Sequence, residues 1–128
     1  MNFSMTYPDI FTIKERIELL ERSILVNSYA YYELNDNILA DYQYDANAAQ
    51  LEKFAKQFPA EFLKSRYYKY FDDYCVVDDD STHYTSGFDL IKRVKDDDEE
   101  LYRRIRMDAV MALDLKMHPP VGMRTRND

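Results

Sequence analysis

Glycine is almost absent from this sequence, and its absence restricts the folds that the chain can adopt. Among the 128 residues, only Gly87 and Gly122 are glycines. Glycine takes positive φ angles at no steric cost, so a chain with so few glycines is poorly suited to tight hairpin turns. We therefore expect a mainly α-helical fold. A chain of this length usually forms one domain, which we place at residues 1–118.

The first half of the sequence predicts a helical hairpin over residues 12–59. Thr12 and Glu15 have the spacing of a capping box, which begins a helix that we expect over residues 12–33. The following "LNDNILAD" is typical of a turn, because Asn and Asp side chains bond to nearby backbone. Asp41 is the expected capping residue of a second helix, which runs to Phe58 and is closed by Pro59.

The second half, residues 66–118, is less regular. The segment "RYYKYFDDYCVV" (residues 66–77) has the aromatic and β-branched content of a strand or buried ribbon, so a small β-hairpin around 67–86 is compatible with it. "FDLIKRV" predicts a short helix. Acids followed by apolar residues at helical spacing predict a C-terminal helix over residues 96–117, packed over the hairpin. Residues 119–128 are expected to form a flexible tail.

Charge and hydropathy exclude some classes of partner. The net charge of −7 would repel the phosphates of nucleic acid, so we expect no direct binding to DNA or RNA. No apolar run has the length of a membrane span, and we expect neither an export leader nor a membrane partner. The single Cys75 has no second cysteine for an internal disulfide, which fits a reducing cytoplasm.

The motif that carries functional information lies at the turn of the predicted hairpin. Asp41, Tyr44 and Asp45 occupy positions i, i+3 and i+4, so they share one face of the second helix. Tyr31 and Tyr32 end the preceding helix, across the loop. Aromatic faces attract a cationic ring, and carboxylates accept hydrogen bonds from sugar hydroxyls or an amide. The five residues together predict a shallow cleft for a nicotinamide nucleotide.

Residues 17–59, which contain "YAYYELNDNILADYQYDANAAQLEKF", resemble the small N-terminal helical domain (domain Ia) of bacterial NAD-dependent DNA ligases. In those ligases the domain holds the nicotinamide mononucleotide (NMN) half of NAD. The resemblance implies that Tyr31, Asp41, Tyr44 and Asp45 contact such a ligand. Tyr32 stands where the ligases have His. NMN or NAD is thus the ligand that the resemblance implies, and no cofactor is required.

The sequence lacks the Lys-x-Asp-Gly motif whose lysine carries the adenylate in ligases. Without that nucleophile no covalent adenylate forms, so we expect no catalytic residues and no enzyme activity. His83 and His118 have no Cys or second His at zinc-ligand spacing, so we expect no metal site. Residues 66–115 are similar to the second half of small ligase-like proteins encoded by phages, which implies a phage-type accessory protein in the host cytoplasm.

Two other interpretations stay open. The tyrosines also have core spacing and Asp41 a capping position, so the motif is compatible with a scaffold that binds no ligand. Clustered carboxylates imitate a phosphate backbone, which favours an acidic phage-encoded inhibitor, such as an anti-CRISPR protein. Its target would be a basic host protein, either a nucleic-acid enzyme or a defence nuclease. The candidate contact residues of that inhibitor are Asp78, Asp79, Asp80, Asp96, Asp97 and Asp98. A solvated acidic face explains the same clusters.

Overall fold

The computed structural model describes residues 11–73, 77–78, 81–82 and 86–118, and it is mainly helical, which confirms the predicted fold class. The described helices are α1 (Ile13–Glu33), α2 (Asp41–Gln57), α3 (Pro59–Leu63), α4 (Tyr68–Phe71), α5 (Gly87–Asp97) and α6 (Glu99–Met117). Two strands of two residues each, β1 (Val77–Asp78) and β2 (Ser81–Thr82), pair antiparallel. The predicted tail at 119–128 lies outside the described residues.

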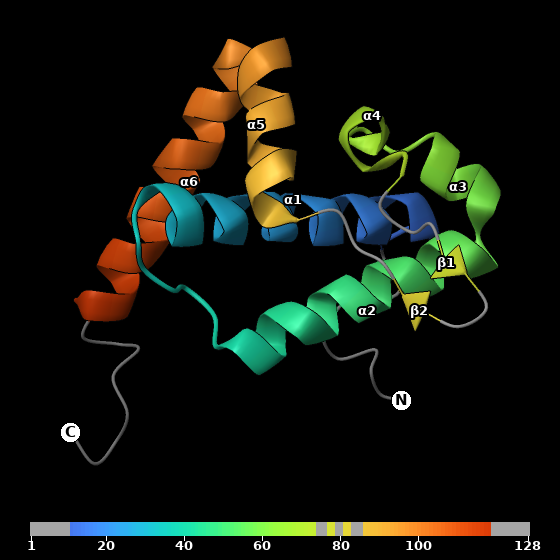
Figure 1. Ribbon diagram of the computed structural model, residues 1–128, viewed down its shortest axis with the longest axis horizontal. Helices are drawn as coiled ribbons and strands as arrows, with labels where there is room; N and C mark the ends of the chain where they lie inside the picture. The colour runs from blue at the N-terminus through green and yellow to red at the C-terminus, as the bar shows by residue number, and fades with distance from the viewer. Residues whose placement is uncertain (1–10, 74–76, 79–80, 83–85, 119–128) are drawn as a thin grey trace.

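Helix α1 is the central element, and the other long helices pack around it. Figure 1 shows α2 running beneath α1, α5 standing across it, α6 passing its C-terminal end, and α3 and α4 beside its N-terminal half. Ile17, Leu20, Ile24 and Leu25 on α1 are at most 1% exposed. These side chains occur at several angles around the helix axis, because α1 is covered by different neighbours on different sides.

The two ends of α1 are set by short-range hydrogen bonds. At the start, Glu15 N–H donates to Thr12 Oγ1 (3.1 Å) and Thr12 N–H donates to Glu15 Oε1 (2.8 Å), which confirms the predicted capping box. At the end, Asn35 takes the left-handed conformation with φ of 55°. Asp36 N–H then donates back to the Ala30 carbonyl (3.0 Å), so the chain leaves the helix and turns toward α2.

The start of α2 and the role of Pro59 differ from the sequence-based expectation. The capping position is Ala40, and Gln43 Oε1 accepts the Ala40 N–H (2.9 Å), whereas Asp41 is the exposed first residue of the helix. The predicted capping role of Asp41 is therefore wrong. Pro59 ends α2 as expected, but it also begins the short helix α3, where its missing N–H costs nothing.

The aromatic segment at 66–77 was expected as a strand or ribbon, and for residues 66–73 that prediction is wrong. These residues form turns and helix α4. Tyr70 and Phe71 are 3% and 0% exposed, and the Tyr68 ring meets Phe62 edge-on at 5.2 Å. The aromatic rings are buried by packing against the helices, so they do not need to belong to a β-sheet. The two-residue β1–β2 pair does fall within the predicted 67–86 range.

The last two helices agree with the predicted pattern. Helix α5 contains the predicted "FDLIKRV" segment, and α6 begins after Asp98, whose Oδ1 accepts the Leu101 N–H (3.0 Å). Leu101, Ile105 and Ala109 face inward from α6, which packs on α1 and α5. None of the described helices combines the length and the apolar character that crossing a membrane requires.

Glu21, in the middle of α1, is fully buried. The single proton of Ser65 Oγ has two acceptors in reach, Glu21 Oε2 at 2.9 Å and the Phe62 carbonyl oxygen at 2.8 Å. A neutral Glu21 resolves this competition, because its own proton goes to Ser65 and the hydroxyl proton goes to Phe62. Burial raises the pKa of Glu21 from 4.5 to about 8, against the opposing effects of Ser65 and the Tyr67 backbone. Glu21 is therefore mostly protonated at neutral pH.

We predict that Glu21 makes the free energy of unfolding fall as the pH rises. Because its pKa is raised from 4.5 to about 8 on folding, the folded state holds a proton that the unfolded state releases in that window. This stabilisation is complete below the lower value and is lost as the pH rises through the upper one, by up to about 5 kcal/mol. Glu21→Gln, which is neutral throughout, should gain stability over the wild type as urea unfolding is repeated at increasing pH.

Glu99→Gln is the matched control, since Glu99 is exposed at the start of α6. Its unfolding free energy should stay parallel to that of the wild type over the same pH range. A Glu21→Gln curve that also stays parallel would mean that Glu21 is ionised in the folded protein.

Candidate functional site

A cleft of about 420 Å³ lies where the end of α1, the beginning of α2 and the first turn of α5 meet. Two of its walls flank the short loop between α1 and α2, and the third comes from residues 86 and 87, which are distant in the sequence, so the complete cleft depends on the tertiary fold. The residues that line it are Asn27, Ser28, Tyr31, Tyr32, Asn37, Ile38, Leu39, Asp41, Tyr44, Asp45, Ala48, Ser86 and Gly87. The volume lies within the range of small-molecule sites, roughly 300 to 1,000 Å³.

All five residues that the sequence motif singled out line this cleft. Tyr31 and Tyr32 come from the last turn of α1, whereas Asp41, Tyr44 and Asp45 come from the first turns of α2. Tyr31 and Tyr32 are 52% and 45% exposed, and Asp41 and Asp45 are also exposed. Tyr31 and Tyr32 are thus not core side chains, and the interpretation of Tyr31 as core filler is wrong. Tyr44 alone of the five is partly buried against the core.

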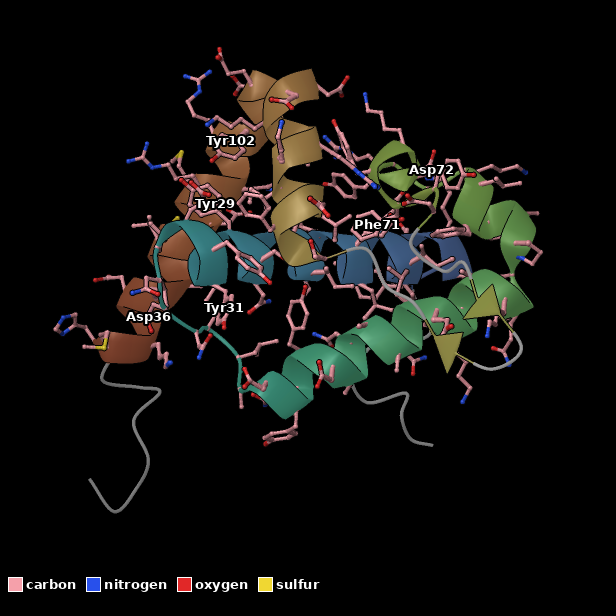
Figure 2. The ribbon with its side chains drawn as sticks, viewed as in Figure 1. Tyr29, Tyr31, Asp36, Phe71, Asp72 and Tyr102 are labelled. Carbon is pink, nitrogen blue, oxygen red and sulfur yellow. The ribbon has the colours of Figure 1, made fainter. Side chains whose placement is uncertain are left out.

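The tyrosines at the end of α1 are arranged edge to face. The ring centroids of Tyr31 and Tyr32 lie 4.8 Å apart at 87°, and Tyr32 meets Phe88 of α5 at 5.9 Å. Tyr29, in contrast, packs at 5.3 Å against Tyr102 of α6. Figure 2 shows Tyr29 beside Tyr102 and Tyr31 on the opposite side of α1, toward α2. Adjacent tyrosines therefore serve two surfaces, one internal and one facing the cleft.

The deep end of the cleft is formed by Tyr44, Ser28 and Gly87. The Tyr44 hydroxyl lies 2.9 Å from Ser28 Oγ, and burial raises the pKa of Tyr44, so its phenol stays neutral at physiological pH. A Cβ at position 87 would lie 2.5 Å from Ser28 Oγ and 3.0 Å from Tyr32 Cε2. Glycine at this position therefore lets α5 approach α1 closely enough to close the floor of the cleft.

The sequence motif did not include the contributions of Asn27 and of the α5 N-terminus. Asn27 Nδ2 donates to the Ser23 carbonyl (2.7 Å), and Oδ1 is buried with no hydrogen-bond partner among the described residues. Ser86 Oγ accepts the Asp89 N–H (3.2 Å) and caps α5. A capping serine before one of only two glycines was the signal that would have marked this helix start.

The cleft carries groups of both electrical signs. Asp41 and Asp45 supply negative charge on the α2 side. The N-terminal end of α5 supplies the positive end of a helix dipole, and Lys116 Nζ donates to the Asn37 carbonyl at the margin. This arrangement suits a ligand that combines a flat ring, hydroxyl groups and an anionic group.

The acidic residues proposed as a partner surface already have local contacts. Asp96 pairs with Lys92 (2.9 Å), Asp97 accepts from the Tyr70 hydroxyl (2.6 Å), and Asp98 caps α6. Asp97 also pairs with Lys69, and these two donors lower its pKa. Asp78 lies in β1, whereas Asp79 and Asp80 fall outside the described residues. The partner surface stays a prediction that none of these contacts specifically favours.

Metal binding has no structural support in the part of the chain that the structure describes. There, no three His, Cys, Asp or Glu side chains gather closely enough to hold a metal ion. The groups that the cleft offers to a ligand are its aromatic rings, its carboxylates and the N-terminal end of α5.

Comparison with known proteins shows a region related to DNA ligase. The chain is 42% identical over 52 residues to a DNA ligase of Pelotomaculum thermopropionicum. The match covers 41% of this chain and 8% of that ligase, so the chain spans a small part of its relative. No protein-family model and no solved structure gave a significant match.

We predict that Gly87→Ala destabilises the protein by about 1 to 3 kcal/mol, because the added methyl group overpacks the contact between α5 and α1. Alanine is the better helix former, so a loss of stability would report the clash and not helix propensity. The Ser28→Ala substitution removes the atom that the new Cβ would meet at 2.5 Å, and it should recover part of the loss in the double variant. Urea unfolding measures both effects. Unchanged stability of Gly87→Ala would contradict the close approach.

Proposed function

We propose that the cleft binds an NMN unit, either free or as half of NAD, and that the protein catalyses no reaction on it. The observation that carries this proposal is the convergence of Tyr31, Tyr32, Asp41, Tyr44 and Asp45 on one open cleft. They do so in a chain of which 41% matches a DNA ligase. The resemblance to the NMN-binding domain of NAD-dependent ligases rests on four of these positions, Tyr31, Asp41, Tyr44 and Asp45, whereas Tyr32 stands where the ligases have His.

The aromatic and acidic groups of the cleft suit the nicotinamide ring and its ribose. The oxidised ring carries a positive charge, and the exposed faces of Tyr31 and Tyr32 attract a cation by about 0.5 to 2 kcal/mol. Asp41 and Asp45 add attraction for the charged ring and accept hydrogen bonds from ribose hydroxyls or from the carboxamide. A reduced, uncharged ring would lose the first of these contributions.

The phosphate of the nucleotide needs a positive environment, which the two aspartates do not supply. The N-terminal end of α5, at Ser86 and Gly87, borders the cleft, and helix N-termini attract anions. Lys116, whose Nζ donates to the Asn37 carbonyl, adds a positive charge at the margin of the cleft. Tyr32 replaces the histidine of the ligases with a phenol, which donates a hydrogen bond but carries no positive charge. We therefore expect weaker phosphate binding than a histidine would give.

The absence of a Lys-x-Asp-Gly motif from the 128 residues supports a role without adenylation. The related DNA ligase is far longer than the matched region, which is 8% of its length. Its joining activity is therefore not part of the proposal for this chain. We propose instead an accessory role in which the protein holds or withholds a nicotinamide nucleotide, as in a phage-type ligase-like protein.

We predict that NMN binds with a dissociation constant of roughly 10 μM to 1 mM, because the tyrosines and carboxylates of the cleft are open to water. Asp45→Asn should weaken binding about tenfold by removing charge while keeping shape, and Tyr31→Ala should weaken it by removing an aromatic wall. Isothermal titration calorimetry with NMN measures both losses, and neither exposed side chain is needed for folding.

Asp72→Asn is the matched control, since Asp72 is an exposed aspartate on the far side of the molecule from Tyr31 (Figure 2). It makes the same change of charge and should bind NMN like the wild type. A flat titration with wild-type protein at millimolar NMN would overturn the proposal. Equal losses in Asp45→Asn and Asp72→Asn would mean that net charge, and not the cleft, controls binding.

A further inference from the structure

Helix α6 has an apolar outer face that nothing in the described fold covers. Eleven large hydrophobic side chains are exposed among the described residues, and five of them lie on this one helix. Their exposed fractions are 60% for Met107, 46% for Val110, 59% for Met111, 48% for Leu115 and 67% for Met117. Single exposed apolar residues are ordinary, but a contiguous group on one helix marks an interaction surface.

The geometry of α6 separates this face from the core. Leu101, Ile105 and Ala109 point inward, and positions 107 and 111 lie about half a turn away from them. Figure 1 shows α6 at the edge of the helical assembly, with α1 and α5 to one side of it. The face is also separate from the cleft, whose lining contains no α6 residue.

Charges at the two ends of the apolar face indicate what covers it. Arg103 and Arg104 are exposed before the first residue of the face, and Asp114 is exposed within its C-terminal half, between Met111 and Leu115. Glu100 pairs with both arginines, so either arginine can turn to another acid while Glu100 keeps a partner. A helix of the same sequence in antiparallel orientation would present acid to base at both ends, whereas a parallel one would present like charges.

We propose that α6 pairs antiparallel with α6 of a second copy of this chain. A pairing centred on residue 109 sets Met107 against Met111 of the second copy, and the same centre sets Arg104 against its Asp114. A two-fold axis forms each of these contacts twice, because the same surface patch faces itself. Flexible methionine side chains suit such a contact, since they adapt to the facing helix.

The contact is limited to one helix face, so the dimer is weak and reversible. Stable protein interfaces bury roughly 1,200 to 2,000 Å² in total, and two paired helices of this length fall at or below the lower end. We expect a dissociation constant of roughly 10 μM to 1 mM. The self-complementary order of apolar and charged residues favours a second copy over an unrelated partner.

Sedimentation velocity from about 5 μM to about 1 mM protein tests the pairing. The wild type should shift from monomer to dimer within this range. Met107→Lys combined with Met111→Lys should remain monomeric, because it places charge at the centre of the contact. Asp114→Arg should weaken the dimer about tenfold or more, because each of its two ends then faces arginine with arginine.

A charge swap separates this pairing from nonspecific association. The double variant Arg104→Asp, Asp114→Arg keeps opposite charges facing each other at both ends, so it should regain the dimer that Asp114→Arg loses. Circular dichroism of each variant checks that α6 stays helical. A wild type that is monomeric at all concentrations would overturn the proposal. So would a dimer that survives the two lysine substitutions, or a double variant as weak as Asp114→Arg.

Discussion

The burial of α1 on several sides is the constraint on which the rest of this structure depends. This helix of 21 residues and the helices α2, α5 and α6 packed around it together supply most of the buried hydrophobic side chains. The same burial encloses polar side chains, which must then be neutral or hydrogen-bonded. Glu21 is held as a neutral acid next to Ser65, and Asn27 bonds to the turn before it. The central helix is therefore both the hydrophobic centre and the place where polar groups are most constrained.

The cleft exists because the neighbours of α1 diverge at its C-terminal end. Tyr29 and Ala30 are still buried, whereas Tyr31 and Tyr32, one turn from the end, are open to solvent. Helix α2 starts beyond a loop and faces these rings with its first two turns, while α5 closes the space from a third direction. The aromatic and acidic walls thus follow from where the packing of the core ends, and Gly87 fixes how closely the third side approaches.

The sequence was sufficient to predict the features that depend on local spacing. The capping box of Thr12, the hairpin of α1 and α2, and the shared face of Asp41 and Asp45 all follow from intervals of three or four residues. The sequence was insufficient where the local structure depends on contacts with residues far away in the chain. Tyr70 and Phe71 are β-prone by type, yet they are buried within the short helix α4. Likewise, the contact of Gly87 with Ser28 joins segments whose adjacency no local pattern encodes.

The predicted capping residue of α2 was wrong for a related reason. Asp41 and Ala40 compete for one position, and the side chain of Gln43 decides the outcome by bonding to the Ala40 amide. Asp41 consequently sits one step inside the helix, where its carboxylate is free to face the cleft instead of satisfying the backbone. The shift of the cap from Asp41 to Ala40 therefore also explains why the Asp41 carboxylate is available to the cleft.

The left-handed turn at Asn35 has a geometric consequence for the space between the two walls. It fixes the direction in which the chain departs from α1, and only a short connection follows before α2 begins. The distance between the tyrosines of α1 and the aspartates of α2 therefore depends on the backbone conformation at Asn35 and on the length of the loop that follows it. A longer or shorter connection would change the width of the cleft between the two walls and therefore the thickness of the ligand that fits there. Insertions or deletions in this loop could thus change ligand selectivity while both helices stay the same.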